Sequence, residues 1–393
     1  MTGRPFLQVP GPTNVPERVL RAMDRAIIDH RGPEFSAVVR GLLPDVARVF
    51  GTEKGRVAIF PTSGTGAWEA SLVNVLAPGD RVLAFEHGYF ARGFAQSGVN
   101  LGLNVDEVPV DWRRPIPAGV VEDALRRGGH KAVLVVHNET STGVRNDIAA
   151  ARAAMDAAGS DALLIVDTVS SLASMEFRFD EWRVDVALTG SQKGLMLPPG
   201  LGLLAIGPRA LAASEKGGSP RNFFDWAAVL RENEAGFFPY TPATLLLFGL
   251  REALDMLFEE GLDAVFARHR RLADAVRAAV RAWGLEIYCQ DADAYSHSLT
   301  AVMTPETLDS GLVITRARER FPLALGVGLG KVKGKLFRIG HLGALNELEV
   351  LAVIGGVEMT LAELGVPVRI GTGAAAAEEA LLASARAPEP SRT

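Results

Sequence analysis

The sequence contains very little cysteine and no long apolar run. Cys289 is the only cysteine among 393 residues, so the chain can form no internal disulfide, and this usage fits a reducing compartment. The longest uncharged segments, residues 194–208 and 236–250, contain proline and glycine and are shorter than the roughly 18 residues of a membrane span. Residues 1–16 lack an apolar signal core. We therefore expect a cytoplasmic protein without a membrane partner.

An excess of positive charge is also missing. Lys and Arg number 41 against 46 Asp and Glu, which gives a formal net charge of -5, and no long basic run occurs. Because a protein that binds nucleic acid needs a basic surface to neutralise phosphates, we expect no nucleic-acid partner. The seven histidines include no pair at the spacing of a HExxH motif, so we expect no metal site. With 48% hydrophobic and 22% charged residues, the composition is that of an ordinary soluble enzyme.

What the sequence does contain is a regular alternation of apolar strands and helical patterns. A first helix is expected to begin near Pro16, and helical patterns follow, for example over residues 65–75 and 147–158. The expected strands are residues 57–60, 81–85, 132–136, 163–166 and 186–188. This alternation predicts an α/β fold, in which a mostly parallel sheet is covered by helices on both faces.

The pattern changes near Gly249. Residues 250–283 indicate one or two helices interrupted at Gly261, and short strands are expected at residues 299–303 and 336–339. These features predict a second, smaller α+β domain. We therefore divide the chain into four parts, namely an N-terminal arm (1–16), a large ligand-binding domain (17–255), a small C-terminal domain (256–370) and an Ala-rich tail (371–393).

Small residues follow the first of these strands. Residues 61–69 read PTSGTGAWE and include Gly64, Thr65, Gly66 and Ala67. Small residues let the backbone approach a ligand closely, and the N-terminus of the following helix offers free N–H groups to an anion. The segment is equally consistent with an ordinary tight turn. A dinucleotide site, and with it a dehydrogenase, is disfavoured because Glu69 stands where that motif needs its third glycine.

Two charged residues follow later strands. Asp167 comes after residues 163–166, and an acid at the end of a buried strand is costly unless it is paired. Lys193 follows residues 186–188, where partial burial would favour the neutral, nucleophilic amine. Taken singly, a cap or salt bridge for the aspartate and a solvated turn for the lysine are the commoner explanations. Ligands of parallel sheets bind at the carboxyl ends of the strands, and the three sites together match the phosphate, ring nitrogen and aldehyde of pyridoxal phosphate (PLP).

The sequence resembles the class V, fold-type I PLP-dependent aminotransferases over nearly its whole length. The resemblance rests on the segments VPGPTNVPE, PTSGTGAWEA, VVHNETSTGV, VDTVSS, DVALTGSQKGLMLPPGLG, FPYTPAT and FRIGHLGALNE. Within this family the sequence is most similar to the branch that uses serine or alanine with glyoxylate. The resemblance implies a large PLP-binding domain with a small C-terminal domain, amino-acid and 2-oxo-acid substrates, and a homodimer with shared active sites.

The resemblance also implies roles for individual residues. Lys193 would carry PLP as a Schiff base and move the substrate Cα proton, and Asp167 would keep the ring nitrogen protonated. Arg338, in FRIG, would bind the substrate carboxylate through its planar fork, with a structural ion pair as the alternative. The other implied cofactor contacts are Thr65, Gly66 and Gln192 at the phosphate with Ala67 beside them, Val169 and Phe90 on the two ring faces, Thr140 near the phenolic oxygen, and Tyr240 and Thr241 reaching the phosphate of the partner subunit.

The activity expected from this resemblance is transamination of serine with glyoxylate. Alanine–glyoxylate, serine–pyruvate and ureidoglycine–glyoxylate transamination are the alternatives. A desulfurase of the same class would need Cys289 as its nucleophile, although that residue lies in no glycine-rich loop. A non-catalytic PLP-binding regulator is a more distant alternative, because neither a DNA-binding appendage nor the loss of a catalytic residue is seen. Lys331, Lys333 and Lys335 form a basic cluster, interpreted as a solvated loop or as a loop near the mouth of the site.

Overall fold

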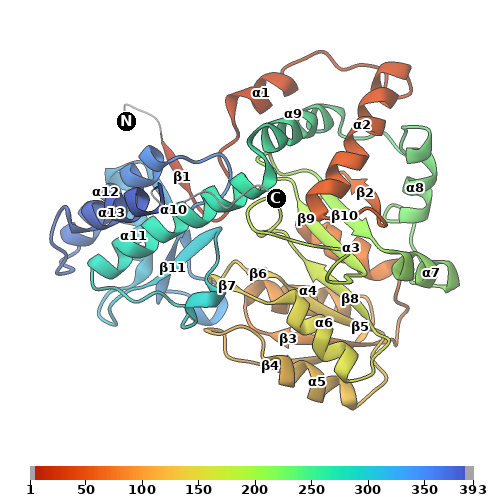
Figure 1. Cartoon of the computed structure of the whole chain (residues 1–393), viewed down its shortest axis with the longest axis horizontal. Coiled ribbons are helices and arrows are strands. Elements are labelled where there is room, and N and C mark those ends of the chain that lie inside the picture. Colours follow the sequence, from red (N-terminus) through yellow and green to blue (C-terminus); the bar gives the residue numbers. More distant parts are fainter. Residues whose placement is uncertain (1–4, 386–393) are drawn as a thin grey trace.

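A seven-stranded sheet forms the centre of the larger part of the molecule in the computed structural model, which describes residues 5–385 (Figure 1). The strand order is β2-β10-β9-β8-β5-β3-β4. Strand β10 runs antiparallel to both of its neighbours, and the other pairings are parallel. The strands are β2 (Arg56–Phe60), β3 (Arg81–Glu86), β4 (Asn104–Pro109), β5 (Ala132–Val136), β8 (Leu163–Asp167), β9 (Val186–Gly190) and β10 (Gly202–Ile206).

The central strands of this sheet are buried along their whole length. Every residue of β5, β8, β9 and β10 is buried, as expected for a parallel sheet covered on both faces. The five strands predicted from the sequence are confirmed. Strands β4 and β10 were not predicted, because β4 is a largely polar edge strand and β10 lies in an apolar run rich in proline and glycine.

Helices cover this sheet, and two of them begin where the sequence indicated. Pro16 is the N-cap residue of α1, and Asp147 caps α6 by accepting a hydrogen bond from the amide of Ala150 at 2.9 Å. No helix within residues 5–385 is long and apolar enough to cross a membrane. The helices of this part are α1 (Glu17–Met23), α2 (Pro33–Phe50), α3 (Gly64–Val73), α4 (Tyr89–Asn100), α5 (Ala118–Arg126), α6 (Ile148–Ala157), α7 (Pro208–Lys216), α8 (Trp226–Glu234) and α9 (Thr244–Glu260), with a short hairpin of β6 (Asn138–Glu139) and β7 (Val144–Arg145).

A second sheet of four strands, in the order β1-β12-β13-β11, forms the smaller part of the molecule. Its first strand comes from the predicted N-terminal arm and pairs in parallel with β12, so the arm joins the C-terminal sheet. The elements are β1 (Phe6–Gln8), β11 (Leu299–Met303), β12 (Leu323–Val327), β13 (Leu336–Gly340), α10 (Leu262–Ala282), α11 (Ser310–Arg320), α12 (Glu347–Glu363), α13 (Thr372–Ala385) and the short 3-10 helices η1 (Ala292–Ala294) and η2 (Gly330–Val332).

The helical segment that follows Gly249 is divided at Gly261. Helix α9 ends at Glu260 and α10 begins at Leu262, with Gly261 between them at φ +86°. The predicted boundary between residues 255 and 256 falls inside α9, and the four domain ranges stay a prediction. In the predicted Ala-rich tail, α13 packs against α10 (Figure 1), and residues 386–393 lie outside the described part of the chain.

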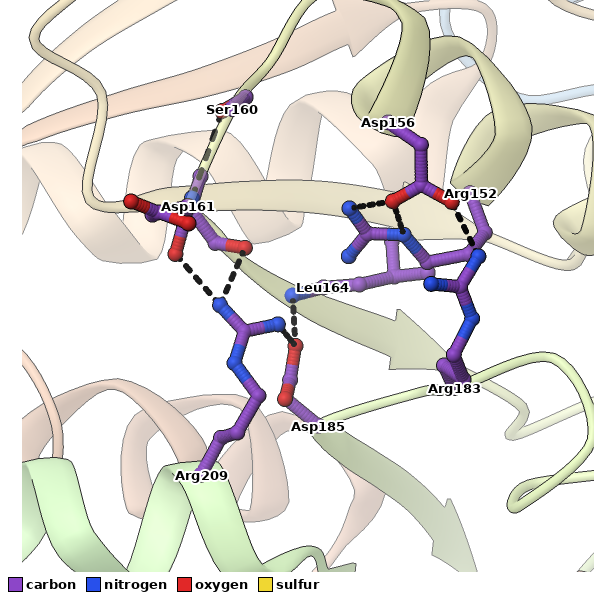
Figure 2. A network of polar contacts seen from close by, with 9 residues as sticks. Arg152, Asp156, Ser160, Asp161, Leu164, Arg183, Asp185 and Arg209 are labelled. Atoms are coloured by element: carbon purple, nitrogen blue, oxygen red, sulfur yellow. Dashed lines mark hydrogen bonds and ion pairs between the residues drawn. The ribbon is translucent and has the colours of Figure 1, made fainter.

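A polar network holds β8 and β9 together at their amino ends (Figure 2). The buried carboxylate of Asp185, which directly precedes β9, accepts a hydrogen bond from the amide of Leu164 at 2.8 Å. Arg209 pairs with the same carboxylate at 3.2 Å and also donates to the carbonyl of Asp161 at 2.5 Å. These contacts hold the two strands together at the amino edge of the sheet, which lies opposite the carboxyl edge.

Candidate active site

A cavity of about 310 Å³ lies at the carboxyl edge of the large sheet. Its walls come from the turns that follow β2, β8 and β9, from the start of α4, from the β6 hairpin and from the N-terminal arm. Seven residues predicted from the sequence line this cavity, namely Thr65, Phe90, Thr140, Asp167, Val169, Gln192 and Lys193. Gly66 and Ala67 lie beside it in the first turn of α3, whereas Arg338, Tyr240 and Thr241 are not among the lining residues.

Lys193 is buried at the end of the turn that follows β9. Burial removes water from its ammonium group and, with the nearby positive charge of Arg338, lowers its pKa to about 8, against the opposing effect of Asp167. Its Nζ donates a hydrogen bond to the carbonyl of Pro10 in the arm. Gly11 follows at φ +95°, and a Cβ there would lie 2.6 Å from Cε of the lysine. The arm therefore covers Lys193, and only glycine fits at that approach.

Asp167 ends β8, and both of its carboxylate oxygens are held. Oδ2 accepts a hydrogen bond from the indole Nε1 of Trp68 at 2.6 Å, and Oδ1 accepts one from the amide of Val169 at 2.7 Å. Burial nevertheless raises the pKa of Asp167 to about 6, because the two hydrogen bonds offset only part of the lost hydration. A cation bound beside this carboxylate would stabilise its charged form. Sequence reasoning missed Trp68, whose indole reads as an ordinary core side chain.

The first turn of α3 lies at one end of the cavity. Ser63 caps the helix and accepts from the amide of Gly66 at 3.4 Å, while Thr65 lines the cavity. A Cβ on Gly64 would lie 2.9 Å from Cγ2 of Val169, so the small residues of this turn are required by close packing. The N–H groups of a helix N-terminus bind anions, which suits a phosphate at this end.

A buried carboxylate fixes the start of α4, where Phe90 stands. Glu139 is fully buried and accepts hydrogen bonds from the amide of Ala91 at 2.9 Å and from the amide and hydroxyl of Ser141 at 2.9 and 2.7 Å. Phe90 and Val169 both reach the cavity from different elements. Glu139 is a second residue that sequence reasoning missed, since nothing in its position along the chain signals that it caps a distant helix.

Arg338 lies on β13, close behind the cavity wall. Its Nη1 donates to the carbonyl of Thr140 at 2.7 Å, and its Nε donates to the carbonyl of Val327 at 2.9 Å. Within residues 5–385 no carboxylate forms an ion pair with this guanidinium, and burial lowers its pKa to about 10. Since neutral carbonyls orient the group without neutralising it, the guanidinium is suited to bind a carboxylate from outside the chain. The structural ion pair considered above is therefore not seen in the described part of the chain.

Tyr240 and Thr241 lie outside the cavity. The ring of Tyr240 stacks on Phe223, with centroids 4.8 Å apart and planes at 22°, and its hydroxyl donates to the carbonyl of Ile59 at 3.4 Å. Thr241 is exposed. The role predicted for these two residues involves a partner subunit and stays a prediction.

The cavity thus offers three different binding functions within one small volume. An amine at Lys193, a carboxylate at Asp167 and a helix N-terminus at Thr65 suit an aldehyde, a cationic ring nitrogen and a phosphate, respectively. The side-chain oxygens of Asn138 and Gln192, both lining residues, are buried without a hydrogen-bond partner in the described residues, so the site holds polar atoms that a ligand can satisfy. The residues present therefore fit PLP.

Comparison with known proteins identifies the family. The model of the family described as aminotransferase class-V matches residues 6–318. The chain is 48% identical to serine–glyoxylate aminotransferase of Arabidopsis thaliana, over 95% of this chain and 94% of the relative. It is 45% identical to L-aspartate–glyoxylate aminotransferase of Paracoccus denitrificans, over 96% of each. The crystal structure of ureidoglycine–glyoxylate aminotransferase from Bacillus subtilis matches with a TM-score of 0.90 at 28% identity, over 97% of this chain and 98% of that one. The chain therefore belongs to the class-V aminotransferases, which are PLP-dependent enzymes.

Proposed function

We propose that this aminotransferase transfers the amino group of serine to glyoxylate, giving hydroxypyruvate and glycine. The observation that carries the proposal is the 48% identity, over nearly the whole chain, to a relative named serine–glyoxylate aminotransferase. The small cavity supports it, because about 310 Å³ is at the lower end of the range for ligand sites, and the cofactor occupies part of it. Serine and glyoxylate are both small enough to share the remaining space.

Bound PLP supplies a carbonyl that exchanges with the amino group and a ring that accepts electrons from the substrate. Lys193 holds the cofactor and then acts as the general base, taking the proton from Cα of the amino acid. The pKa of about 8 suits this role, since a buried amine near neutrality can both accept and release a proton. Ping-pong kinetics follow, because the amino group stays on the enzyme between the two substrates.

Asp167 keeps a proton on the ring nitrogen through an ion pair, and Trp68 and the amide of Val169 aim its two oxygens. Thr65, Gly66 and Gln192, with Ala67 in the same turn, hold the phosphate. Val169 and Phe90 would enclose the ring, and Thr140 would lie near its phenolic oxygen. These residues orient the cofactor and exclude water, so that the electrostatic interactions inside the site are strong.

Arg338 binds the α-carboxylate of either substrate. Its guanidinium is turned toward the cavity wall by the Thr140 carbonyl and has no carboxylate partner in the described residues. Transamination of aspartate is the second candidate, because a relative of that name is 45% identical. Aspartate carries a second carboxylate, however. Among the described residues Lys193 is the only cationic side chain that lines the cavity, and Arg338 behind its wall is already assigned to the α-carboxylate. This lining favours serine over aspartate as the donor.

A donor panel tests the proposal. Purified enzyme with bound PLP is mixed with serine, alanine, aspartate or ureidoglycine, and the change in cofactor absorbance is followed, after which glyoxylate or pyruvate is added to restore the first spectrum. We expect serine and glyoxylate to give the largest kcat/KM. A larger value for alanine, aspartate or ureidoglycine, or for pyruvate as acceptor, would replace the proposed pair by the corresponding rival.

The same experiment separates an enzyme from a PLP-binding regulator. A chain that binds PLP and shows no spectral change with any donor is a regulator, and a colourless chain that gains no absorbance band with added PLP contradicts the proposed site. Lys193→Ala should lose the band of the lysine-bound cofactor. A desulfurase activity is disfavoured because Cys289 is buried, donates to the carbonyl of Asp291 at 3.3 Å and does not line the cavity.

We also propose a cytoplasmic homodimer, in which Tyr240 and Thr241 of each subunit reach the cofactor phosphate of the other. The exposed position of Thr241 outside its own cavity supports this arrangement. Light scattering should give twice the mass of the chain, and Thr241→Asp should weaken PLP binding through charge repulsion. A monomer in solution would contradict the shared site. Recovery of the enzyme in the soluble cytoplasmic fraction of cells tests the location.

A further inference from the structure

The loop between β12 and β13, residues 328–335, crosses from the small part of the molecule to the large one. The ammonium of Lys331 forms an ion pair with Glu86 at the end of β3 and lies 5.1 Å from the ring centroid of Trp112. Lys331 is thus the one lysine of its basic cluster that forms an ion pair with the large part, since Lys333 and Lys335 form no ion pair within residues 5–385. The contact joins two regions whose relative position determines the shape of the site.

The backbone of this loop rests on two aromatic rings. A Cβ on Gly330 would lie 3.3 Å from Cη2 of Trp112 and 3.4 Å from Cδ2 of Tyr89. These three residues line a second cavity of about 550 Å³, which shares Thr65, Trp68 and Phe90 with the cofactor cavity. The loop therefore covers the space that adjoins the active site on the far side of Phe90.

The same loop is tied to the substrate-binding arginine. The carbonyl of Val327, the residue at which β12 ends and the loop begins, accepts the hydrogen bond from Nε of Arg338 at 2.9 Å. Gly326 is the direct cross-strand partner of Arg338, and Val327 is that of Phe337. A displacement of the loop would therefore move one of the two carbonyls that aim the guanidinium.

The surroundings of Lys331 favour this contact. Glu86 is mostly buried, with 19% of its side chain exposed, while that of Lys331 is 58% exposed. The pKa of Glu107 is raised, mainly by burial and also by the charge of Glu86, and the positive charges of Arg92 and Lys331 offset only part of this shift. The ammonium thus contacts the Glu86 carboxylate and the Trp112 ring, and its charge also acts on Glu107. Because the lysine side of this ion pair is exposed, the contact is of modest strength and can open without unfolding the site.

We propose that Lys331, with Glu86 and Trp112, is a latch that positions Arg338 and so sets the affinity of the enzyme for the carboxylates of its substrates. This inference rests on the proposed role of Arg338 and extends it to a second residue. Lys331 touches neither cofactor nor substrate and is a positioning residue. When the latch is closed, the Val327 carbonyl holds the guanidinium toward Thr140; when it is open, the guanidinium loses that restraint.

Four variants of the full-length enzyme with bound PLP test the latch: Lys331→Gln, Lys331→Arg, Glu86→Gln and, as the matched control, Lys333→Gln. The control removes the same charge from the same loop at an exposed position without an ion pair in the described residues. We expect Lys331→Gln to raise KM for both amino acid and 2-oxo acid about three- to tenfold, with kcat within about twofold of wild type. Lys331→Arg should restore KM, and Lys333→Gln should leave it unchanged.

Glu86→Gln should reproduce the effect of Lys331→Gln, and the double variant should be no worse than either single one. Hydrogen–deuterium exchange of residues 328–335 should be faster in Lys331→Gln than in wild type and Lys333→Gln, and this readout is independent of the reaction. The inference is overturned if Lys331→Gln and Lys333→Gln give equal KM values, or if their loop exchange is the same. If no donor is transaminated but the exchange differs as expected, the proposed function fails while the latch contact stands.

Discussion

Replacing Trp68 by phenylalanine should weaken cofactor binding through a single hydrogen bond. The indole Nε1 donates to Oδ2 of Asp167 at 2.6 Å, and the phenyl ring has no such donor. The packing of the site changes little, because the ring of Trp68 stacks on Phe94, with centroids 5.6 Å apart and planes at 18°, and an aromatic side chain at position 68 can keep that contact. The perturbation is therefore mainly electrostatic.

The size of the effect follows from the charge on Asp167. A hydrogen bond to a charged group contributes about 1.5–3 kcal/mol, and one pKa unit corresponds to about 1.36 kcal/mol. Losing the bond should therefore raise the pKa of Asp167 by about one to two units above its value of about 6. With a raised pKa the carboxyl stays protonated, and therefore neutral, up to a higher pH. A neutral carboxyl cannot form an ion pair with a cationic ring nitrogen. We expect PLP affinity near pH 7 to fall about two- to tenfold, because the ionised fraction of Asp167 falls by that factor, with a smaller loss at higher pH.

The assay is a titration of the cofactor-free protein with PLP, followed by absorbance, at a pH near 6.5 and again near 8.5. Trp226→Phe is the control, because it also removes an indole donor, the one to Ser214 Oγ at 2.9 Å, away from the cofactor cavity. That variant should keep wild-type affinity at both pH values. If Trp68→Phe binds PLP as tightly as wild type at the lower pH, the reasoning that links Trp68 to the charge of Asp167 is wrong.

Three further predictions follow from the buried charges. The rate at which the cofactor-free enzyme captures PLP should rise with pH, with a midpoint near 8, because burial lowers the pKa of Lys193 and only the neutral amine attacks the aldehyde. Stopped-flow absorbance measures this rate, and a rate that still rises steeply well above the midpoint would contradict the lowered pKa. Arg338→Gln should raise KM for both carboxylate substrates about 10- to 100-fold. It should also move the midpoint of the capture rate to higher pH, because the arginine charge no longer opposes protonation of Lys193. Unchanged steady-state KM values would exclude Arg338 as the carboxylate site. Asp185→Ala should lower the free energy of unfolding by about 1–3 kcal/mol, because the amide of Leu164 loses its buried acceptor. Urea titrations measure this change, and PLP affinity should stay the same. Equal stability of variant and wild type would show that the network at the amino edge does not stabilise the fold.

The main features of the site could be predicted because they follow from sheet topology. Once residues 163–166 and 186–188 are identified as neighbouring parallel strands, Asp167 and Lys193 must meet at the same edge. The helix N-terminus at Thr65 reaches that edge for the same reason, since β2 runs in the same direction as β9 with β10 between them. Strand direction and residue order along the chain were enough to bring these residues together.

The parts that could not be predicted depend on contacts between distant segments. The apolar residues 202–206 could at most predict a buried strand. Their sequence does not indicate that β10 runs antiparallel to its two neighbours. The side chain of Trp68 donates a hydrogen bond to Asp167, which is 99 positions away in the sequence. The side chain of Glu139 accepts one from the amide of Ala91 at the start of α4, which is 48 positions away. The pairing of β1 with β12 joins residues 6–8 to residues 323–325, more than 300 positions later in the chain. Side-chain direction in the folded state decides each of these, and residue type does not encode it.

The polar groups around the site have one property in common, which is that the chain alone balances their charges only in part. Burial drives each of them toward its neutral form, lowering the pKa of Lys193 to about 8 and that of Arg338 to about 10, and raising that of Asp167 to about 6. A fold selected for stability alone would place apolar residues there, because unpaired buried charge is destabilising. The cofactor and the substrate supply the missing partners, namely an aldehyde for Lys193, a cationic nitrogen for Asp167 and a carboxylate for Arg338. Pairing of these three groups with ligand therefore contributes to the binding energy that orients cofactor and substrate for transamination.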